Sequence, residues 1–476
     1  MTIRKQPSDF HVEELLAPET LASIKDRAEG IHTHALYQLE KASLTTPAAI
    51  NELCRAIKAR PDHASYAGLK DKHAETRQHV TVKLRTPADA PREAQGKQWR
   101  ARLQGFLDHP IAAADITGNR FAIVVRDLSR PASEEMDRRA SLLSETPSPR
   151  EGAGGGPTSS PATSSPRHPD TSLLLTNYFG AQRFGSARHG QGWIAKSLIT
   201  GDFETALKLA IGTPARKDTG KTRDFTRILA SRWGDWKGIL KDLPRLPEAR
   251  AIETLARGGD FKDAFAALPY FLQSLVIEAY QSHLWNRCAC ELVRALSEAP
   301  SPREGVGGRE ISEAHPPGER VGGRAISKTP SPREGAGGGS RHGTSPFELP
   351  DPKSHFSTPD EFGEMLFSPA AMVQRHWRHL EIPLLARNSE LSDPWKETYE
   401  RVLESEGIAL ADLRVKGLKR PFFGEATRRL FVEARGFSLS PPEPDELSRG
   451  GLRKRTASFD LPRGAYATVV LRALGQ

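Results

Sequence analysis

The sequence predicts an α+β protein in which one β-sheet is interrupted by an inserted helical domain. Residues 1–143 contain alternating apolar residues of the kind found in half-buried strands. Residues 419–476 end in another strand-like run, and the intervening residues 171–418 show mostly helical patterns. Strand-bearing blocks at both ends of a chain bury their apolar faces most simply by joining one sheet, so we expect the central block to be an insertion into it.

The N-terminal block carries one helical and two strand-like patterns. Residues 48–60 show helical periodicity, and Thr46-Pro47 before them suits a cap and first turn. The apolar stripe of this helix consists of Ile50, Leu53, Cys54 and Ile57. Val80, Val82 and Leu84 alternate as in a strand, and Phe121 to Val125 predicts another strand after a turn at Gly118-Asn119.

The central block predicts several helices and the C-terminal block a strand. Gly201-Asp202-Phe203 and Gly259-Asp260-Phe261 each precede a helical pattern, with the aspartate as N-cap. Residues 272–296 predict a long helix. Its apolar stripe consists of Leu275, Val276, Ala279, Leu284, Cys288 and Leu292. At the C-terminus, Tyr466 to Leu471 predicts a strand.

Two stretches, 144–170 and 297–345, are dense in Pro, Gly, Ser and Arg. The string Ser-Pro-Arg-Glu-Gly occurs in both, and residues 146–156 reappear unchanged at 329–339. They hold almost no apolar positions to bury, so we interpret them as disordered low-complexity insertions. Their net charges are −1 and +1. The formal net charge of +9 therefore belongs to the segments that we expect to fold.

The net charge and the number of cysteines indicate what kind of partner the protein binds and in which cellular compartment it works. The pI of about 9.4 favours a polyanion, either nucleic acid or an anionic membrane surface. Cys54, Cys288 and Cys290 are too few for a disulfide framework, and Cys288-x-Cys290 lacks a second ligand pair at zinc spacing. We expect structural thiols and no metal. With no apolar signal sequence and no long apolar run, we expect a cytoplasmic protein without a membrane anchor.

The segment from Tyr66 to Gln78 concentrates the most reactive side chains. Asp71 lies between Lys70 and Lys72 and is followed by His73. Nearby cations favour the ionised form of a carboxylate and attract RNA phosphates. An ionised aspartate serves as a nucleophile or a base. The charge pattern alone is more typical of a solvated charged turn.

Two other segments suit an unstacked pyrimidine. Asn119 offers an amide to a base edge, and Phe121, two residues later, offers a face for stacking. Asn177 to Gly185 combines three aromatic residues with Arg183. The alternative for the first segment is a plain turn with a core Phe, and for the second a domain junction whose aromatic residues belong to the core. The basic runs at 216–227 and 449–455 suit either phosphate contact or an ordinary solvated surface.

Five segments together resemble the TruD family of pseudouridine synthases. The most specific are Ala67-Gly-Leu-Lys-Asp-Lys-His-Ala and Asn177-Tyr-Phe-Gly-Ala-Gln-Arg-Phe-Gly. The other three are Pro7 through Glu13, Gly118 through Leu128 and Gly464 through Arg472. The resemblance covers nearly the whole chain outside the two insertions. The chain departs from the family's pattern at Arg4, where lysine is common, and at Ser8, where an acidic residue is usual.

The resemblance implies a fold, a reaction and a set of site residues. The fold is an antiparallel pseudouridine synthase sheet flanked by helices and interrupted by an α-rich TruD-specific domain. The implied divisions are a catalytic domain of 1–143 and 419–476, and an inserted domain of 171–418. The reaction is isomerisation of uridine 13 in tRNA. Because it involves no redox step or hydrolysis, we expect no cofactor or metal, and we expect a monomer. Asp71 falls on the catalytic aspartate. By the resemblance, Phe10, Asn119 and Tyr466 line the uridine pocket and Phe121 stacks near the target base. From the residues of the other segments we add Lys70, His73, Asn177 and Arg183 as expected substrate-binding residues.

Three questions stay open at this point. Attack by Asp71 at C1′ and addition at C6 both fit the residues. A non-catalytic RNA-binding protein of the same fold is the alternative function. A carboxylate-dependent hydrolase would need a facing acid, and Glu75 is the best candidate near Asp71.

Overall fold

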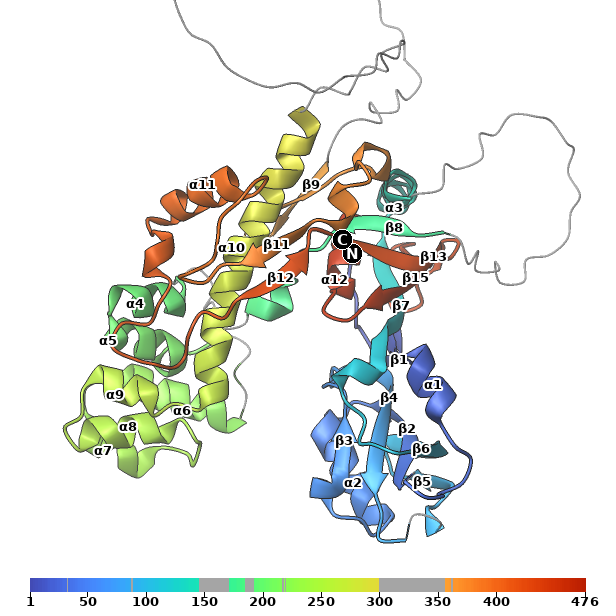
Figure 1. Ribbon diagram of the computed structural model, residues 1–476, viewed down its shortest axis with the longest axis horizontal. Helices are drawn as coiled ribbons and strands as arrows, with labels where there is room; N and C mark the ends of the chain where they lie inside the picture. Colours follow the sequence, from blue (N-terminus) through green and yellow to red (C-terminus); the bar gives the residue numbers. More distant parts are fainter. Residues whose placement is uncertain are drawn as a thin grey trace, which may run out of the picture.

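The computed structural model describes residues 1–31, 33–86, 89–144, 171–184, 192–215, 218, 220–298, 356–360 and 363–476. Apart from a few residues at their ends, the two predicted low-complexity insertions lie outside these residues. Gly185, the last residue of the Asn177-to-Gly185 segment, also lies outside them. Figure 1 shows two arms that diverge from a junction, at which the N- and C-termini lie side by side. One arm is built of N-terminal strands, and the other is mostly helical.

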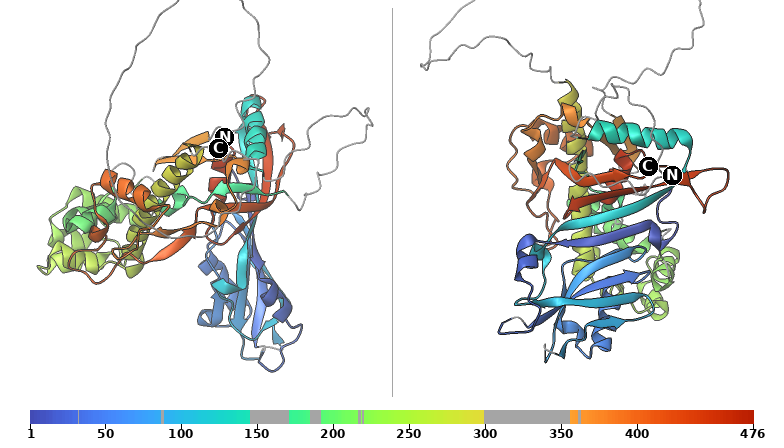
Figure 2. Two further views of the ribbon diagram at one scale, coloured as in Figure 1. Left: turned by 45° about the horizontal axis from the view of Figure 1, so that its top comes forward. Right: turned by 90° about the vertical axis from the view of Figure 1, so that its right-hand side faces the viewer.

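An eleven-stranded sheet runs through the strand arm into the junction, in the order β5-β6-β2-β4-β1-β7-β15-β13-β8, with β3 paired to β4 and β14 to β15. The right-hand view of Figure 2 shows these strands one above another, with the N-terminal strands (blue to teal) below the C-terminal strands (red). The bounds are β1 Phe10–Leu16, β2 His34–Ala42, β3 Ala64–Tyr66, β4 Glu75–Lys83, β5 Glu93–Gln95, β6 Trp99–Leu107, β7 Ile116–Leu128, β8 Leu173–Thr176, β13 Phe431–Leu439, β14 Glu443–Pro444 and β15 Arg453–Pro462.

The predicted α+β class with a sheet and flanking helices is confirmed, with one refinement. β1 and β4 pair in parallel, so the sheet is mixed, whereas its other pairings are antiparallel. Strands from both ends of the chain meet where β7 pairs with β15. The sheet also takes β8 from the central block, because Leu173–Thr176 pairs with β13.

Helix α2 covers one side of the strand arm and α1 (Pro18–Ser23) the other (Figure 1). α2 spans Thr46–Ala56, slightly shorter than predicted, and Thr45 is its N-cap. Its predicted stripe is buried against β2, β4 and β6. Figure 1 shows α2 on the side of the sheet that faces the helical arm.

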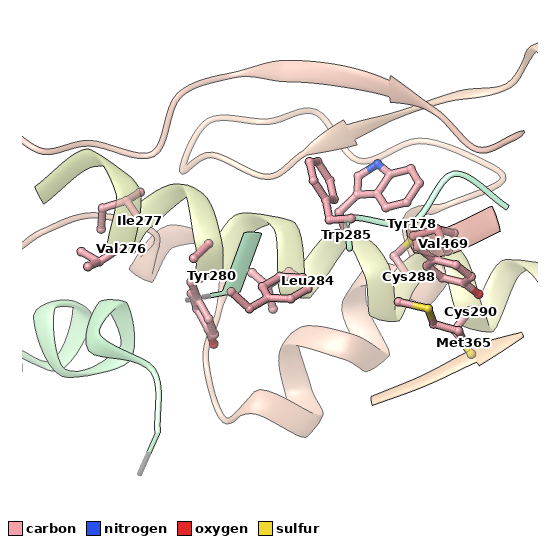
Figure 3. Packing of buried hydrophobic residues seen from close by; sticks show 14 of the residues in the cluster. Tyr178, Val276, Ile277, Tyr280, Leu284, Trp285, Cys288, Cys290, Met365 and Val469 are labelled. Carbon is pink, nitrogen blue, oxygen red and sulfur yellow. The ribbon is translucent and has the colours of Figure 1, made fainter. Parts of the chain in front are cut away.

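The helical arm is organised by α10 (Tyr270–Glu298), the predicted long helix. Figure 3 shows Tyr178, Met365 and Val469, from three distant segments, packed around its side chains. Cys288 and Cys290 belong to this core, where burial raises the pKa of both thiols. The other helices are α3 Arg130–Leu143, α4 Ile194–Thr200, α5 Phe203–Leu207, α6 Gly220–Ser231, α7 Trp236–Asp242, α8 Ala249–Ala256, α9 Phe261–Ala266, α11 Lys396–Glu406 and α12 Ala467–Ala473. The short strands are β9 Phe356–Asp360, β10 Gly363–Phe367, β11 Glu381–Leu384 and β12 Ala426–Arg429.

Both predicted aspartate caps are confirmed, and two local predictions are wrong. Asp202 and Asp260 accept backbone hydrogen bonds from Thr205 and Asp263 at the starts of α5 and α9. Residues 467–471, predicted as a strand, form the first part of α12, because their apolar side chains are buried around a helix in the junction. Gly118-Asn119, predicted as a turn, continues β7, where Gly118 lies against the Leu461 backbone with no room for a Cβ.

Candidate active site

Asp71 lies in the loop between β3 and β4, and this loop is fastened to α2 and the sheet. The Lys70 amide donates to Thr46 Oγ1 at 3.0 Å, at the first residue of α2. Thr46 Oγ1 in turn donates to Gln78 Oε1 at 2.9 Å, and Gln78 Nε2 reaches the Gly68 carbonyl. Thr46 and Gln78 are both buried. The loop is therefore fastened to the first residue of α2 and to Gln78 of β4.

The carboxylate of Asp71 is held by Arg4 and by its own loop. Arg4 Nη1 lies 3.0 Å from Asp71 Oδ2, and the His73 amide donates to Asp71 Oδ1 at 2.9 Å. Lys41, almost fully buried on β2, donates to the Asp71 carbonyl at 2.9 Å. About a fifth of the Asp71 side chain is exposed. The carboxylate is thus oriented but still reachable from solvent.

Lys70 does not neutralise its sequence neighbour. Its ammonium lies 2.6 Å from Glu14 Oε1 and donates to Asn119 Oδ1 at 3.0 Å. Glu14 is buried beside His79, and its carboxylate accepts a hydrogen bond from the His79 amide. Burial alone would raise the pKa of Glu14, but the hydrogen bonds from His79 and the charge of Lys70 lower it. Lys70 therefore fixes the Asn119 side chain on β7.

Arg4 connects Asp71 to a row of aromatic rings. Its guanidinium lies 4.2 Å from the ring centroid of Phe10, and Phe10 meets Phe121 edge-on at 6.3 Å. Phe121 then packs against Phe459 of β15 at 5.6 Å. Arg4 has a φ of +65°, a conformation that residues other than glycine seldom adopt. Such conformations cluster at functional sites, where surrounding contacts hold them.

The remaining predicted residues gather around Arg428 in the junction. Arg428 donates to the Asn177 carbonyl at 2.8 Å and to the Asn177 Oδ1 at 2.6 Å. It also donates to Gly464, just before Tyr466. Its guanidinium covers the Phe179 ring at 4.1 Å and approaches Tyr466 at 5.9 Å. Burial lowers the pKa of Arg428 to about 10 and raises that of Tyr466.

Arg183 joins this second group from the segment after Phe179. Its side chain lies 2.6 Å from Glu278 Oε2 of α10 and hydrogen-bonds Ser282. A Cβ at Gly180 would approach the Tyr466 ring to 3.0 Å, which explains the glycine in this segment. Tyr466 therefore packs directly on the Asn177-to-Arg183 segment.

The predicted site residues thus form two groups. The first group consists of Phe10, Lys70, Asp71, His73, Asn119 and Phe121. The second group consists of Asn177, Arg183 and Tyr466. The described residues show no hydrogen bond, ion pair or ring contact between the groups. The sheet connects them, because Pro462, four residues before Tyr466, pairs with Gly118, next to Asn119.

The other face of the sheet carries a separate cavity of about 430 Å³. It is lined by charges that pair with one another, including His11 with Glu75 at 3.3 Å and Arg77 with Glu40 at 3.1 Å. His11 alternates along β1 with Phe10, which contacts Arg4. Glu75 therefore lies on the opposite face from Asp71 and cannot act as the facing acid of a hydrolase.

Sequence reasoning missed four residues that hold these groups together. Glu14, Lys41 and Arg428 were not predicted, and Arg4 was noted only as a departure from a motif. Lys41 and Glu14 lie on strands far from Asp71 in sequence, so no local pattern marks them. The position of Arg4 just before Pro7-Ser-Asp-Phe was the one available signal.

Comparison with known families decides the classification. The sequence model of tRNA pseudouridine synthase D (TruD) matches residues 1–306. The chain belongs to this family. The reaction class expected from the sequence, isomerisation of uridine in tRNA, is that of the tRNA pseudouridine synthase D family, and a non-catalytic RNA-binding protein is not favoured.

Relatives of this family align along nearly the whole chain. The tRNA pseudouridine synthase D of Aquifex aeolicus is 25% identical, covering 99% of this chain and 97% of the relative. A protein of Methanocaldococcus jannaschii named "Probable tRNA pseudouridine synthase D 2" is 24% identical, covering 99% and 91%. The crystal structure of a TruD homologue from Methanosarcina mazei shares the fold, with a TM-score of 0.61 at 20% identity and coverage of 99% and 92%.

Membrane-spanning helices and clusters of metal ligands are both missing from the described part of the chain. None of its helices combines the length and apolar character needed to span a bilayer. Its His, Cys, Asp and Glu side chains do not gather into a group of three or more that could hold a metal ion.

Proposed function

We propose that this protein isomerises uridine 13 of tRNA to pseudouridine, with Asp71 as the catalytic carboxylate. The reaction breaks the N1–C1′ bond, rotates the base and joins C5 to C1′. N1 gains a proton and C5 loses one, so no group is added or removed. The observation that carries the proposal is the partly exposed Asp71 carboxylate, fixed by Arg4 beside Phe10.

We infer that the target uridine leaves its stack to reach this carboxylate. Unstacking costs on the order of a few kcal/mol. Contacts to Arg4, Phe10 and Phe121 offset this cost. The Arg4 Nε–H supports this role, because it has no hydrogen-bond partner among the described residues and an acceptor on the substrate would satisfy it. Asn119, oriented by Lys70, then presents its amide to the uracil edge.

The second group is proposed to close the other side of the site. His73 contributes its amide to the Asp71 loop, while Tyr466, Asn177 and Arg183 meet the RNA from the junction. Arg428 supports them by fixing the Asn177 segment and the start of α12. We propose that a monomer in the cytoplasm carries out this reaction, with 1–143 and 419–476 as the catalytic domain and 171–418 as the insertion.

The test is pseudouridine mapping on tRNA incubated with the wild type and Asp71→Asn. We expect a new pseudouridine at position 13 with the wild type and a loss of at least about 1000-fold in rate with the variant. The tRNA affinity of the variant should stay within about twofold, since an uncharged isostere keeps the loop geometry. Asp62→Asn, an exposed aspartate of the same arm, is the matched control and should keep full activity.

Two outcomes would contradict this assignment. Equal activity of Asp71→Asn and wild type would remove Asp71 from the chemistry. Tight tRNA binding without any new pseudouridine would favour the binding-protein alternative. A separate incubation with tRNA that contains 5-fluorouridine distinguishes attack by Asp71 at C1′ from addition at C6. An adduct through C6 and one through C1′ give different hydrolysed products.

A further inference from the structure

A basic segment of the helical arm has no role in the site described above. Residues 413–424 connect α11 to β12 and contain Arg414, Lys416, Lys419 and Arg420 but no acidic residue. The segment and Arg387 border a hollow of about 650 Å³. We call residues 413–424 the basic segment.

Burial alternates along the basic segment, so its cations face outward. Leu413, Val415 and Phe423 are buried, whereas Arg414, Lys416, Lys419 and Arg420 are exposed. Gln281 of α10 fastens the end of the segment by donating to the Gly424 carbonyl at 2.9 Å. The cations are therefore presented by a backbone that is held in place.

These cations lack carboxylate partners, unlike three cations of the basic runs predicted from sequence. Among the described residues, none of Arg387, Arg414, Lys416, Lys419 and Arg420 lies within 4.0 Å of a carboxylate oxygen. In the predicted runs, Arg227 pairs with Asp224, Arg455 with Asp137 and Lys454 with Glu446. Lys221, Arg223, Arg449 and Arg453 of the same runs form no ion pair among the described residues. Unpaired cations at one place attract a polyanion more strongly than cations that are already neutralised.

Exposed aromatic rings lie beside these cations. Tyr270 and Phe271, at the start of α10, are 50% and 77% exposed, and Phe422 is 59% exposed. Arg420 lies 5.7 Å from the Tyr270 ring centroid, which joins the start of α10 to the basic segment. Leaving rings of this size in water forgoes the free energy of burying them. Cations next to exposed rings are the combination that binds unpaired nucleotides.

We propose that the basic segment and the start of α10 form a second RNA-binding surface, which grips an unpaired stretch of the tRNA remote from the target uridine. The four cations contact phosphates, and Phe422 and Phe271 stack on bases. The surface belongs to the helical arm, whereas Asp71 belongs to the strand arm (Figures 1 and 2). It therefore serves affinity and choice of RNA and not the chemical step. The proposal rests on tRNA being the substrate.

The test compares three variants of the full chain for affinity and for rate at saturating protein. The first is Arg414→Gln/Lys416→Gln/Lys419→Gln, and the second is Phe271→Ala/Phe422→Ala. The third is the matched control Lys221→Gln/Arg223→Gln/Arg227→Gln in α6. All of these side chains are exposed, so the variants should fold. Dissociation constants for tRNA are measured at several salt concentrations.

We expect the basic-segment variant to raise the Kd at least tenfold and to reduce the slope of log K against log salt by about 2 to 3. The aromatic variant should raise the Kd by at least about 30-fold without changing the slope. It should leave the affinity for a fully double-stranded RNA unchanged. Both should keep the saturating rate of pseudouridine formation within about twofold.

Four results would overturn the proposal. The first is a Kd equal to that of the α6 control, and the second is an unchanged Kd with a reduced saturating rate. The third is an equal loss of affinity for double-stranded RNA in the aromatic variant. The fourth is binding to phosphatidylserine vesicles that depends on the basic segment as strongly as tRNA binding does. If the wild type forms no pseudouridine while tRNA binding still depends on the segment, the proposed function fails and this surface stands.

Discussion

Individual residues at the site are controlled by partners that are distant in sequence. Asp71 has lysines on both sides, yet Arg4 forms the ion pair and Lys41 holds the backbone. Lys70 is occupied by Glu14 and Asn119. A loop places consecutive side chains in different directions, so sequence adjacency did not predict these contacts. The sequence offered Asp71 as a candidate carboxylate, but it did not indicate the partners that hold it.

Lys41 provides a prediction at this scale. Burial lowers the pKa of Lys41 to about 8, from 10.5 in an unfolded chain, although the nearby Asp71 raises it. Between pH 8 and 10.5 the unfolded state therefore binds more protons, and the free energy of unfolding rises with pH. Across this range, we expect the free energy of unfolding of the wild type to rise by about 3 kcal/mol relative to that of Lys41→Met, at about 1.4 kcal/mol per pH unit. Denaturant unfolding at each pH measures the difference.

The exposed Lys83 at the end of β4 provides the control. Lys83→Met should show no such trend relative to wild type. A difference between wild type and Lys41→Met that stays constant with pH would contradict the lowered pKa of Lys41.

Among the elements, helices were predicted more reliably than strands. The apolar stripes of α2 and α10 were found because apolar residues that recur every 3.6 positions over several turns are typical of a helix and not of a strand. The short run 467–471 was mistaken for a strand because its β-branched residues suit either element when all sides are buried. β13 and β15, which complete the sheet, were not predicted.

At this scale, the start of α2 links helix stability to the site. Thr46→Val removes the hydrogen bonds to the Lys70 amide and Gln78 while preserving side-chain shape. Thr45→Ala removes only the N-cap bond to the Ala48 amide. Each should lower the free energy of unfolding by about 1–2 kcal/mol. We expect Thr46→Val alone to reduce the rate of pseudouridine formation, by about tenfold, because the Asp71 loop loses its anchor.

Thermal unfolding and single-turnover rates on tRNA measure the two effects separately. If Thr46→Val keeps the full rate at a lowered Tm, the anchor serves stability and not the site.

At the scale of the whole molecule, Arg126 ties the two ends of the chain together. Its buried guanidinium donates to Asp9, before β1, at 2.9 Å and to Asp445, between β13 and β15, at 2.7 Å. Both carboxylates are buried. Burial alone would raise the pKa of Asp445, but hydrogen bonds from Ser448, the Asp127 amide and Arg126 lower it. This network holds the N-terminal and C-terminal strands in one sheet.

Arg126→Met should destabilise the protein by about 3–5 kcal/mol, because it leaves two buried carboxylates without a cation. Arg130→Met is the control. Arg130 pairs with Glu134 in an exposed ion pair on α3, so its loss should cost less than about 0.5 kcal/mol. Chemical denaturation of the two variants gives the comparison. Similar stability of both would mean that the network contributes little to joining the ends.

The α+β class, the long helices, the family resemblance and the candidate carboxylate could all be predicted from the order of the residues. These features depend on local periodicity, on helix caps and on short motifs, each of which involves residues that are close together in the sequence. The folded arrangement was needed to show that Arg4 reaches Asp71, that Glu75 lies on the opposite face and that Arg428 holds Tyr466. It also showed that Arg227, Lys454 and Arg455 of the predicted basic runs are paired with carboxylates. Strand pairing and ion pairing join residues tens to hundreds of positions apart, and no local pattern records which of several possible partners is chosen.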